Sequence, residues 1–217
     1  MKNELQVTVV GCGGSTGVPD IFGDWGDCDP NNPKNRRTRN AIYVEKGDTN
    51  ILVDCGPDVR IQMGALPNPP KTLTGLLLTH IHPDHTCGFY EMRNYAKQAE
   101  TGVLNIYSHE QCLQEIETAY PFMFFEKPHY PRAIIPNIMQ EGRYNIGDIV
   151  VDVFDMDHGN CKTLGFIFDE KIAYCTDVKV IPDAALDRMA SLNLDAFIVE
   201  CTDYKEMPFH AHFDLAL

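Results

Sequence analysis

Residues 79–85 read THIHPDH, and the interpretation of the whole chain depends on this stretch. It places three histidines and an aspartate within six positions, directly after the apolar run LTGLLL. His80 and His82 alternate, so in an extended backbone both side chains point to the same side. A proline then breaks the strand, and Asp84 and His85 follow at the start of a predicted helix. Imidazole and carboxylate groups at such a rigid junction suit zinc, manganese or iron.

A metal ion needs further ligands, and three candidates lie later in the chain. His158 follows the apolar stretch 149–154, Asp177 follows AYC, and His212 follows the stretch 196–200 after a loop. Each lies just past the C-terminal end of a predicted strand, where functional loops gather. One such residue alone is usually a cap or a solvated side chain. Together with the first cluster, the three form a coherent ligand set.

The surrounding pattern predicts an α+β fold within one domain, residues 1–217. Predicted strands cover 5–10, 41–47, 50–56, 73–80, 103–108, 148–159 and 194–202, and the longest predicted helix covers 84–98. The Gly-Asp pair at 47–48 indicates a hairpin turn. The proline-rich segment 121–136 is predicted to be an ordered loop or lid. Hairpins in both halves with helices between them favour a two-layer sheet sandwich covered by helices over a doubly wound parallel sheet.

Composition limits the classes of function. The chain has 217 residues, 44% of them hydrophobic, and a formal net charge of −13. This charge repels nucleic acids and anionic membranes on average, so we expect neither as a partner. No apolar stretch approaches the roughly 20 residues that a membrane span needs. Eight cysteines without a CxxC pair, and no apparent signal peptide, lead us to expect reduced thiols in the cytoplasm.

THIHPDH resembles the HxHxDH motif of the metallo-β-lactamase superfamily. The resemblance implies an αββα sandwich, with two mixed sheets flanked by helices and a two-metal site between the sheets. Three further stretches, GCGGSTGVPD, DPNNPKNRRTRN and ILVDCGPDVR, are similar to one branch of that superfamily. That branch contains phosphoribosyl 1,2-cyclic phosphate phosphodiesterase.

The resemblance also implies roles for individual residues. Two divalent ions, zinc or manganese, would be held by His80, His82 and His158 at one position, by Asp84 and His85 at the other, and by Asp177 between them. Asp54 would orient the histidine-rich turn by hydrogen bonds. His212 would serve as a general acid or phosphate contact, with His210 as the competing candidate. Asp84 and His212 are therefore the predicted catalytic residues.

Two other features modify this prediction. The segment RRTRN places Arg36, Arg37 and Arg39 close together, either as a solvated turn or as a grip on substrate phosphate. Members of the superfamily continue past the segment HFDLAL to a strand that ends in a further ligand histidine. This sequence ends at Leu217, so we expect the C-terminal strand and helix of the fold to be missing and the second metal site to be incomplete.

The leading functional hypothesis is a metal-dependent phosphodiesterase that cleaves a small cyclic or nucleotide-like phosphodiester, as a monomer or a homodimer. One alternative is a tRNA 3′-processing endonuclease, disfavoured by the negative charge and by the lack of a basic arm. A second is a thioester hydrolase of the glyoxalase type. A third, without catalysis, is a binding protein related to the pyrroloquinoline quinone biosynthesis family.

Overall fold

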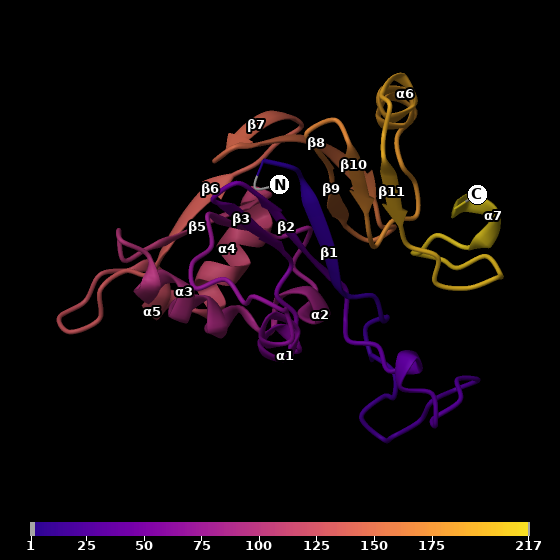
Figure 1. The fold of residues 1–217 in the computed structure, drawn as a ribbon, viewed down its shortest axis with the longest axis horizontal. Coiled ribbons are helices and arrows are strands. Elements are labelled where there is room, and N and C mark those ends of the chain that lie inside the picture. The colour runs from indigo at the N-terminus through magenta and orange to yellow at the C-terminus, as the bar shows by residue number, and fades with distance from the viewer. Residues whose placement is uncertain (1–2, 217) are drawn as a thin grey trace.

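The computed structural model describes residues 3–216 and contains two sheets with helices on both outer faces (Figure 1). The first sheet has the order β1-β2-β3-β4-β5-β6, formed by Gln6–Gly11, Ala41–Lys46, Thr49–Val53, Gly75–Leu77, Leu104–Ser108 and Ile134–Ile138. Strands β1 to β3 pair antiparallel, and the pairs from β3 to β6 are parallel. This mixture confirms the predicted α+β class.

The second sheet has the order β11-β10-β9-β8-β7, formed by Ala196–Val199, Ile172–Cys175, Lys162–Phe168, Ile149–Asp157 and Gly142–Ile146. Its pairs are antiparallel except β10 with β11. The turn between β9 and β10 has Asp169 at φ +49° and Glu170 at φ +58°. Two successive residues in this left-handed region are typical of the two-residue turn that fits the twist of a hairpin.

Helices cover the two sheets unequally. The first sheet packs against α1 to α5, formed by Val59–Gly64, Pro83–Thr86, Met92–Gln98, Glu110–Ala119 and Pro121–Phe124. Helix α6 (Asp183–Ser191) packs on the second sheet, and α7 (Phe213–Ala216) lies near the C-terminus (Figure 1). Two short 3-10 helices cover Pro33–Asn35 and Phe89–Glu91. Within residues 3–216, no helix has both the length and the apolar character that crossing a membrane requires.

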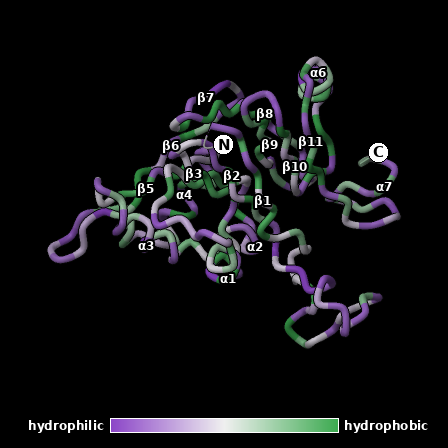
Figure 2. The backbone as a smooth tube through the Cα atoms, viewed as in Figure 1, coloured by the Kyte–Doolittle hydropathy of each residue, from purple (hydrophilic) through white to green (hydrophobic). Residues whose placement is uncertain are grey.

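The inner strands β2 to β4 of the first sheet are buried on both faces, which explains their nearly continuous apolar sequences. In β2, Ile42 and Val44 point into the core between the sheets, whereas Tyr43 points toward the helices. In β4, Leu77 faces the second sheet, and its neighbours Leu76 and Leu78 face the helices. Figure 2 shows the hydrophobic segments concentrated in the strands and the polar ones in the connecting loops. The layer order is therefore helix, sheet, sheet, helix, as predicted.

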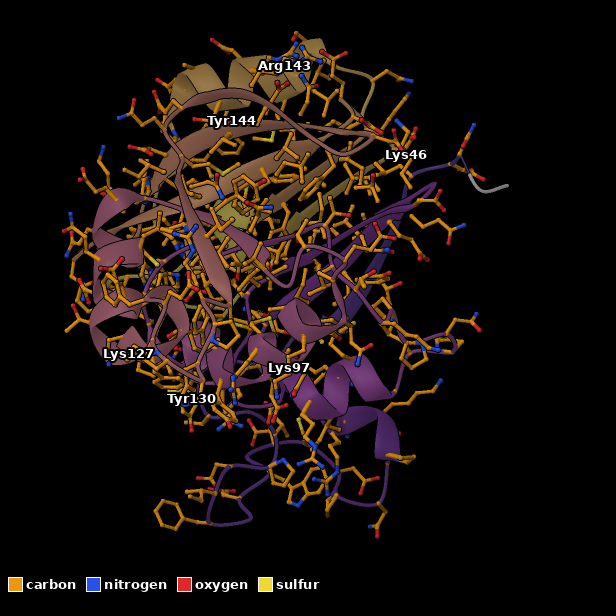
Figure 3. The ribbon with its side chains drawn as sticks, turned by 90° about the vertical axis from the view of Figure 1, so that its left-hand side faces the viewer. Lys46, Lys97, Lys127, Tyr130, Arg143 and Tyr144 are labelled. Carbon is orange, nitrogen blue, oxygen red and sulfur yellow. The ribbon has the colours of Figure 1, made fainter. Side chains whose placement is uncertain are left out.

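The prediction of a loop over 121–136 holds for 125–133 but is wrong at both ends of the segment. A proline at the first position starts α5, and the end of the segment forms β6, which pairs parallel with β5. Pro136 has no backbone N–H group to donate. It is tolerated because β6 is an edge strand and has no neighbouring strand on its outer side that would need this donor. Figure 3 shows Lys127 and Tyr130, between α5 and β6, in the lower half of the view, and Arg143 and Tyr144 of β7 near its top.

Candidate metal centre

The histidine-rich turn after β4 forms a tight group of imidazoles. The ring centroid of His80 lies 4.4 Å from those of His82 and His85. His158, which follows β8 of the second sheet, brings its ring within 5.4 Å of His80 and 5.2 Å of His82. Two sheets therefore supply one cluster, because the ends of β4 and β8 meet at the same edge of the sandwich.

Asp54 fixes the orientation of this turn from beneath. Its carboxylate is fully buried and accepts the backbone N–H of Thr79 at 2.8 Å and the Thr79 hydroxyl at 2.9 Å. It also accepts His85 Nδ1–H at 2.7 Å. Since the Thr79 hydroxyl donates to Asp54, its lone pair is left to accept His80 Nδ1–H at 3.0 Å. Both imidazoles therefore direct Nε2 away from Asp54.

His158 is held in the same way by a different partner. Its Nδ1 donates to the backbone carbonyl of Phe209 at 2.8 Å, which leaves Nε2 as the free nitrogen. His80 is also buried, and its Nε2 has no hydrogen-bond partner among the described residues. A buried nitrogen without a partner costs free energy unless something else binds it. Imidazoles held at Nδ1 with Nε2 free have the arrangement of metal ligands.

Asp177 joins the imidazole cluster from β10. It is buried and has φ +49°, a strained conformation that tends to occur at functional sites. Its Oδ2 lies 2.9 Å from His85 Nε2, and its Oδ1 lies 3.8 Å from His158 Nε2. Asp84 lies beside it, with Oδ2 3.5 Å from His85 Nε2.

The donor set fits divalent metal ions. Three overlapping groups have ligand atoms within 4.8 Å of one another: His80, His82 and His158; His80, His85 and Asp177; His158, Asp177 and His210. Every member is a nitrogen or oxygen donor, which zinc and manganese accept. These groups contain five of the six predicted ligands and add His210, and the sixth, Asp84, lies beside them with Oδ2 3.5 Å from His85 Nε2.

The pKa shifts of these residues are also consistent with metal binding. Burial and the neighbouring His85 lower the pKa of His80 to about 2, so its imidazole is neutral and able to bind a metal. Burial likewise lowers the pKa of His158. Burial opposes the charged forms of His85 and Asp177. The carboxylates of Asp54 and Asp177 nevertheless raise the pKa of His85, and the contact with His85 lowers the pKa of Asp177. A metal ion would take the place of the proton that these groups share.

Among the described residues, His210 and not His212 joins the cluster of candidate ligands. His210 lies in the centre: its ring centroid is 4.8 Å from that of His158, and its Nδ1 is 3.8 Å from Asp177 Oδ1. His212 lines neither cavity described below, and its Nδ1 is buried without a partner among the described residues. The spacing of the two histidines could not separate them, because the loop before them decides which one points inward.

Glu200, which sequence reasoning missed, holds that loop in place. Its Oε1 accepts the backbone N–H groups of Val178 at 2.7 Å and Ala211 at 3.1 Å. Its Oε2 lies 3.1 Å from His210 Nδ1. The one feature of the sequence that could have indicated this role is the position of Glu200 directly after the apolar strand β11.

Two of the three arginines of RRTRN contact other groups of the protein. This differs from the alternative in which all three bind substrate phosphate. Arg39 donates to Asp58 at 3.1 Å and to the Ser15 carbonyl at 3.1 Å. Arg36 lies over the ring of Trp25, 5.2 Å from its centroid. Arg37 is the one of the three that lines a cavity beside the metal centre.

Two connected hollows open onto the centre. The larger, about 540 Å³, is walled by the glycine-rich loop after β1 and by the ends of β10 and β11, and it includes Arg37, Asp84, Asp177 and His210. The smaller, about 170 Å³, is lined by His82, Asp84, His158, Asp177 and His210 among others. Asp84, Asp177 and His210 line both, so they face a molecule that enters from either side.

Comparisons with known proteins agree with the geometry. A family model described as a beta-lactamase superfamily domain matches residues 49–217. The octanoyltransferase of Porphyromonas gingivalis is 28% identical over 216 residues, which cover 98% of this chain and 42% of that protein. A ribonuclease Z of Mycobacterium sp. (strain KMS) is 42% identical over 81 residues, 37% of this chain and 23% of that protein. The chain thus spans less than half the length of these curated relatives.

The fold has a close match among solved structures. The crystal structure of a diphosphatase from the PhnP family has a TM-score of 0.85 at 25% identity, and the match covers 98% of this chain and 81% of that one.

Proposed function

Since the chain belongs to the metallo-β-lactamase superfamily, whose members include metal-dependent hydrolases, we propose that it hydrolyses a small phosphoric diester. The observation that carries this proposal is the cluster of free Nε2 atoms and carboxylates between the two sheets. The similarity to a diphosphatase supports a phosphorus-containing substrate. A cytoplasmic location and action without a nucleic-acid partner remain part of the proposal.

The residues divide into holding and reacting groups. We propose that His80, His82, His158, Asp84, His85 and Asp177 hold two divalent ions, zinc or manganese. When bound, such ions supply a nucleophilic water at neutral pH and stabilise developing charge on a phosphoryl oxygen. Asp54 keeps the turn in register through Thr79 and His85.

His210 is the proposed proton donor to the leaving group. Its Nδ1 contacts Glu200, so its Nε2 is available on the cavity side. Arg37 is the proposed contact for a substrate phosphate, since it lines the larger cavity. We therefore assign to His210 the role of general acid that the sequence analysis predicted for His212.

The test is hydrolysis of bis(p-nitrophenyl) phosphate by protein reconstituted with Mn²⁺ or Zn²⁺. Asp177→Asn should abolish turnover, because it removes a charge from the centre while asparagine tolerates φ +49°. Asp169→Asn is the matched control: that aspartate has the same φ but pairs with Lys46 away from the centre. Absence of turnover in metal-loaded wild-type protein, with all diester substrates tried, would refute the proposal.

A tRNA 3′-processing endonuclease is the second candidate, because the matched ribonuclease Z is 42% identical over 81 residues. The net charge of −13 opposes it, since phosphate backbones are bound by basic surfaces. Cleavage of precursor tRNA in the same assay series would favour it over a small diester. Hydrolysis of a glutathione thioester would instead favour the glyoxalase-type alternative.

A further inference from the structure

A chain of hydrogen bonds links the segment before β2 to Asp177. Asn40 Nδ2 lies 2.9 Å from Thr176 Oγ1, and Thr176 Oγ1 lies 3.0 Å from Asp177 Oδ2. A carboxylate can only accept, so the hydroxyl must donate to Asp177 and accept from the asparagine amide. Thr176 and Asp177 are both buried, which shields the chain from competing water. The direction of every proton in the chain is therefore determined.

We infer that Asn40 and Thr176 are positioning residues for the Asp177 carboxylate at the metal centre. The inference deepens the proposed function and rests on it. Thr176 and His85 both contact Oδ2, at 3.0 and 2.9 Å. Oδ1 is thereby turned toward His158 and His210, each at 3.8 Å. Without the hydroxyl, the carboxylate is free to rotate and to present either oxygen to either side.

Hydrogen bonds to Thr38 and Arg39 hold the chain directly before Asn40 in place. Gln62 of α1 donates to the Arg39 carbonyl at 2.7 Å and to the Thr38 hydroxyl at 3.0 Å. Asp58 accepts the backbone N–H of Arg39 at 3.0 Å. Asn40 therefore belongs to the rigid layer of the first sheet, whereas Thr176 follows β10 of the second. The hydrogen-bond chain sets the position of Asp177 across the two layers.

Asn40 and Thr176 also line the larger cavity, so a direct contact with substrate is the competing explanation. The two explanations predict different measurements. A substrate contact changes KM and leaves metal binding intact. Positioning of Asp177 changes the affinity for metal in the absence of any substrate, and it lowers kcat with little effect on KM.

The experiment measures the Mn²⁺ dissociation constant of metal-free protein by calorimetry, followed by kcat and KM on bis(p-nitrophenyl) phosphate. Thr176→Val keeps the shape and removes the hydroxyl, and we expect about tenfold to hundredfold weaker Mn²⁺ binding. Asn40→Leu removes one neutral hydrogen bond, and we expect a loss of about twofold to tenfold. Thr176→Ser should restore binding. Asn94→Leu, an exposed asparagine of α3 bonded to Glu91, is the matched control and should not change it.

Wild-type Mn²⁺ affinity in both Thr176→Val and Asn40→Leu would overturn the inference, as would a change confined to KM. The inference would also be overturned if Thr176→Ser bound Mn²⁺ as weakly as Thr176→Val does. That result would indicate that packing of the side chain, and not the hydroxyl, determines the affinity. If Thr176→Val does not fold, the half-buried Asn40 still decides the question. If wild-type protein hydrolyses no diester, the proposed function fails, but the Mn²⁺ titration still tests the positioning role.

Discussion

Asp54→Asn tests how much the metal centre depends on the buried group beneath it. The substitution keeps the size of the side chain, and asparagine tolerates the φ of +63° at this position. The carboxylate accepts from two groups of Thr79 and from His85 Nδ1. An amide has one accepting oxygen, so its NH₂ group must face at least one of these donors.

The expected loss follows from those contacts. If the amide oxygen stays on Thr79, His85 Nδ1–H loses a charge-assisted partner, and the ring no longer has a fixed tautomer. A hydrogen bond to a charged group contributes about 1.5–3 kcal/mol. At about 1.36 kcal/mol per factor of ten, the affinity for metal should fall roughly tenfold to 150-fold. That range overlaps the roughly tenfold to hundredfold effects known for partners of metal ligands.

The assay is a competition titration of Zn²⁺ or Mn²⁺ against a chelator of known affinity, with circular dichroism to verify the fold. Asp169→Asn serves as the control, because Asp169 also has a left-handed backbone and an ionic partner, Lys46, but lies away from the centre. Metal affinity within about threefold of wild type in folded Asp54→Asn protein would refute the reasoning, since it is well below the tenfold lower bound.

Three further outcomes are expected. His82→Ala should lower the metal content and abolish turnover without unfolding the protein, because His82 is half-buried and contributes no core packing; elemental analysis and thermal melting check this. His210→Ala should lower kcat by about 10²–10⁴-fold with metal still bound, whereas His212→Ala should leave kcat unchanged in the same kinetic assay. Asp155→Asn should destabilise the fold by less than about 1 kcal/mol at neutral pH. Burial opposes ionisation of Asp155, but Lys162 and His109 hold its pKa below the usual value. The stabilisation is therefore present above about pH 3.9 and lost as the pH falls, and chemical denaturation at several pH values measures it.

The fold and the first cluster were predictable because local sequence determines them. The alternation of His80 and His82 and the strand break after them depend on neighbouring residues alone. The apolar strands β2 to β4 likewise follow from their burial on both faces. His158 and Asp177 were predictable as residues that directly follow strands, where the strand end fixes their location.

The rest of the site depends on contacts between distant segments, which no local pattern contains. Glu200 selects His210 over His212 through two backbone N–H groups, one of them at Val178. Asn40 meets Thr176 across 136 positions of sequence. The sequence left open whether the arginines of RRTRN are solvated or contact phosphate for the same reason: a cluster of positive charge does not show that Asp58 pairs with Arg39.

The scattered origin of the cluster has a consequence for the maturation of the protein. The ribosome makes the histidine-rich turn first, and His158, Asp177 and His210 follow 73, 92 and 125 positions after His85. Until the second sheet is complete, the turn lacks the partners that would close around an ion. The cluster is therefore complete only when both sheets have folded, and we expect a chain that ends before the second sheet to bind metal more weakly than the full chain.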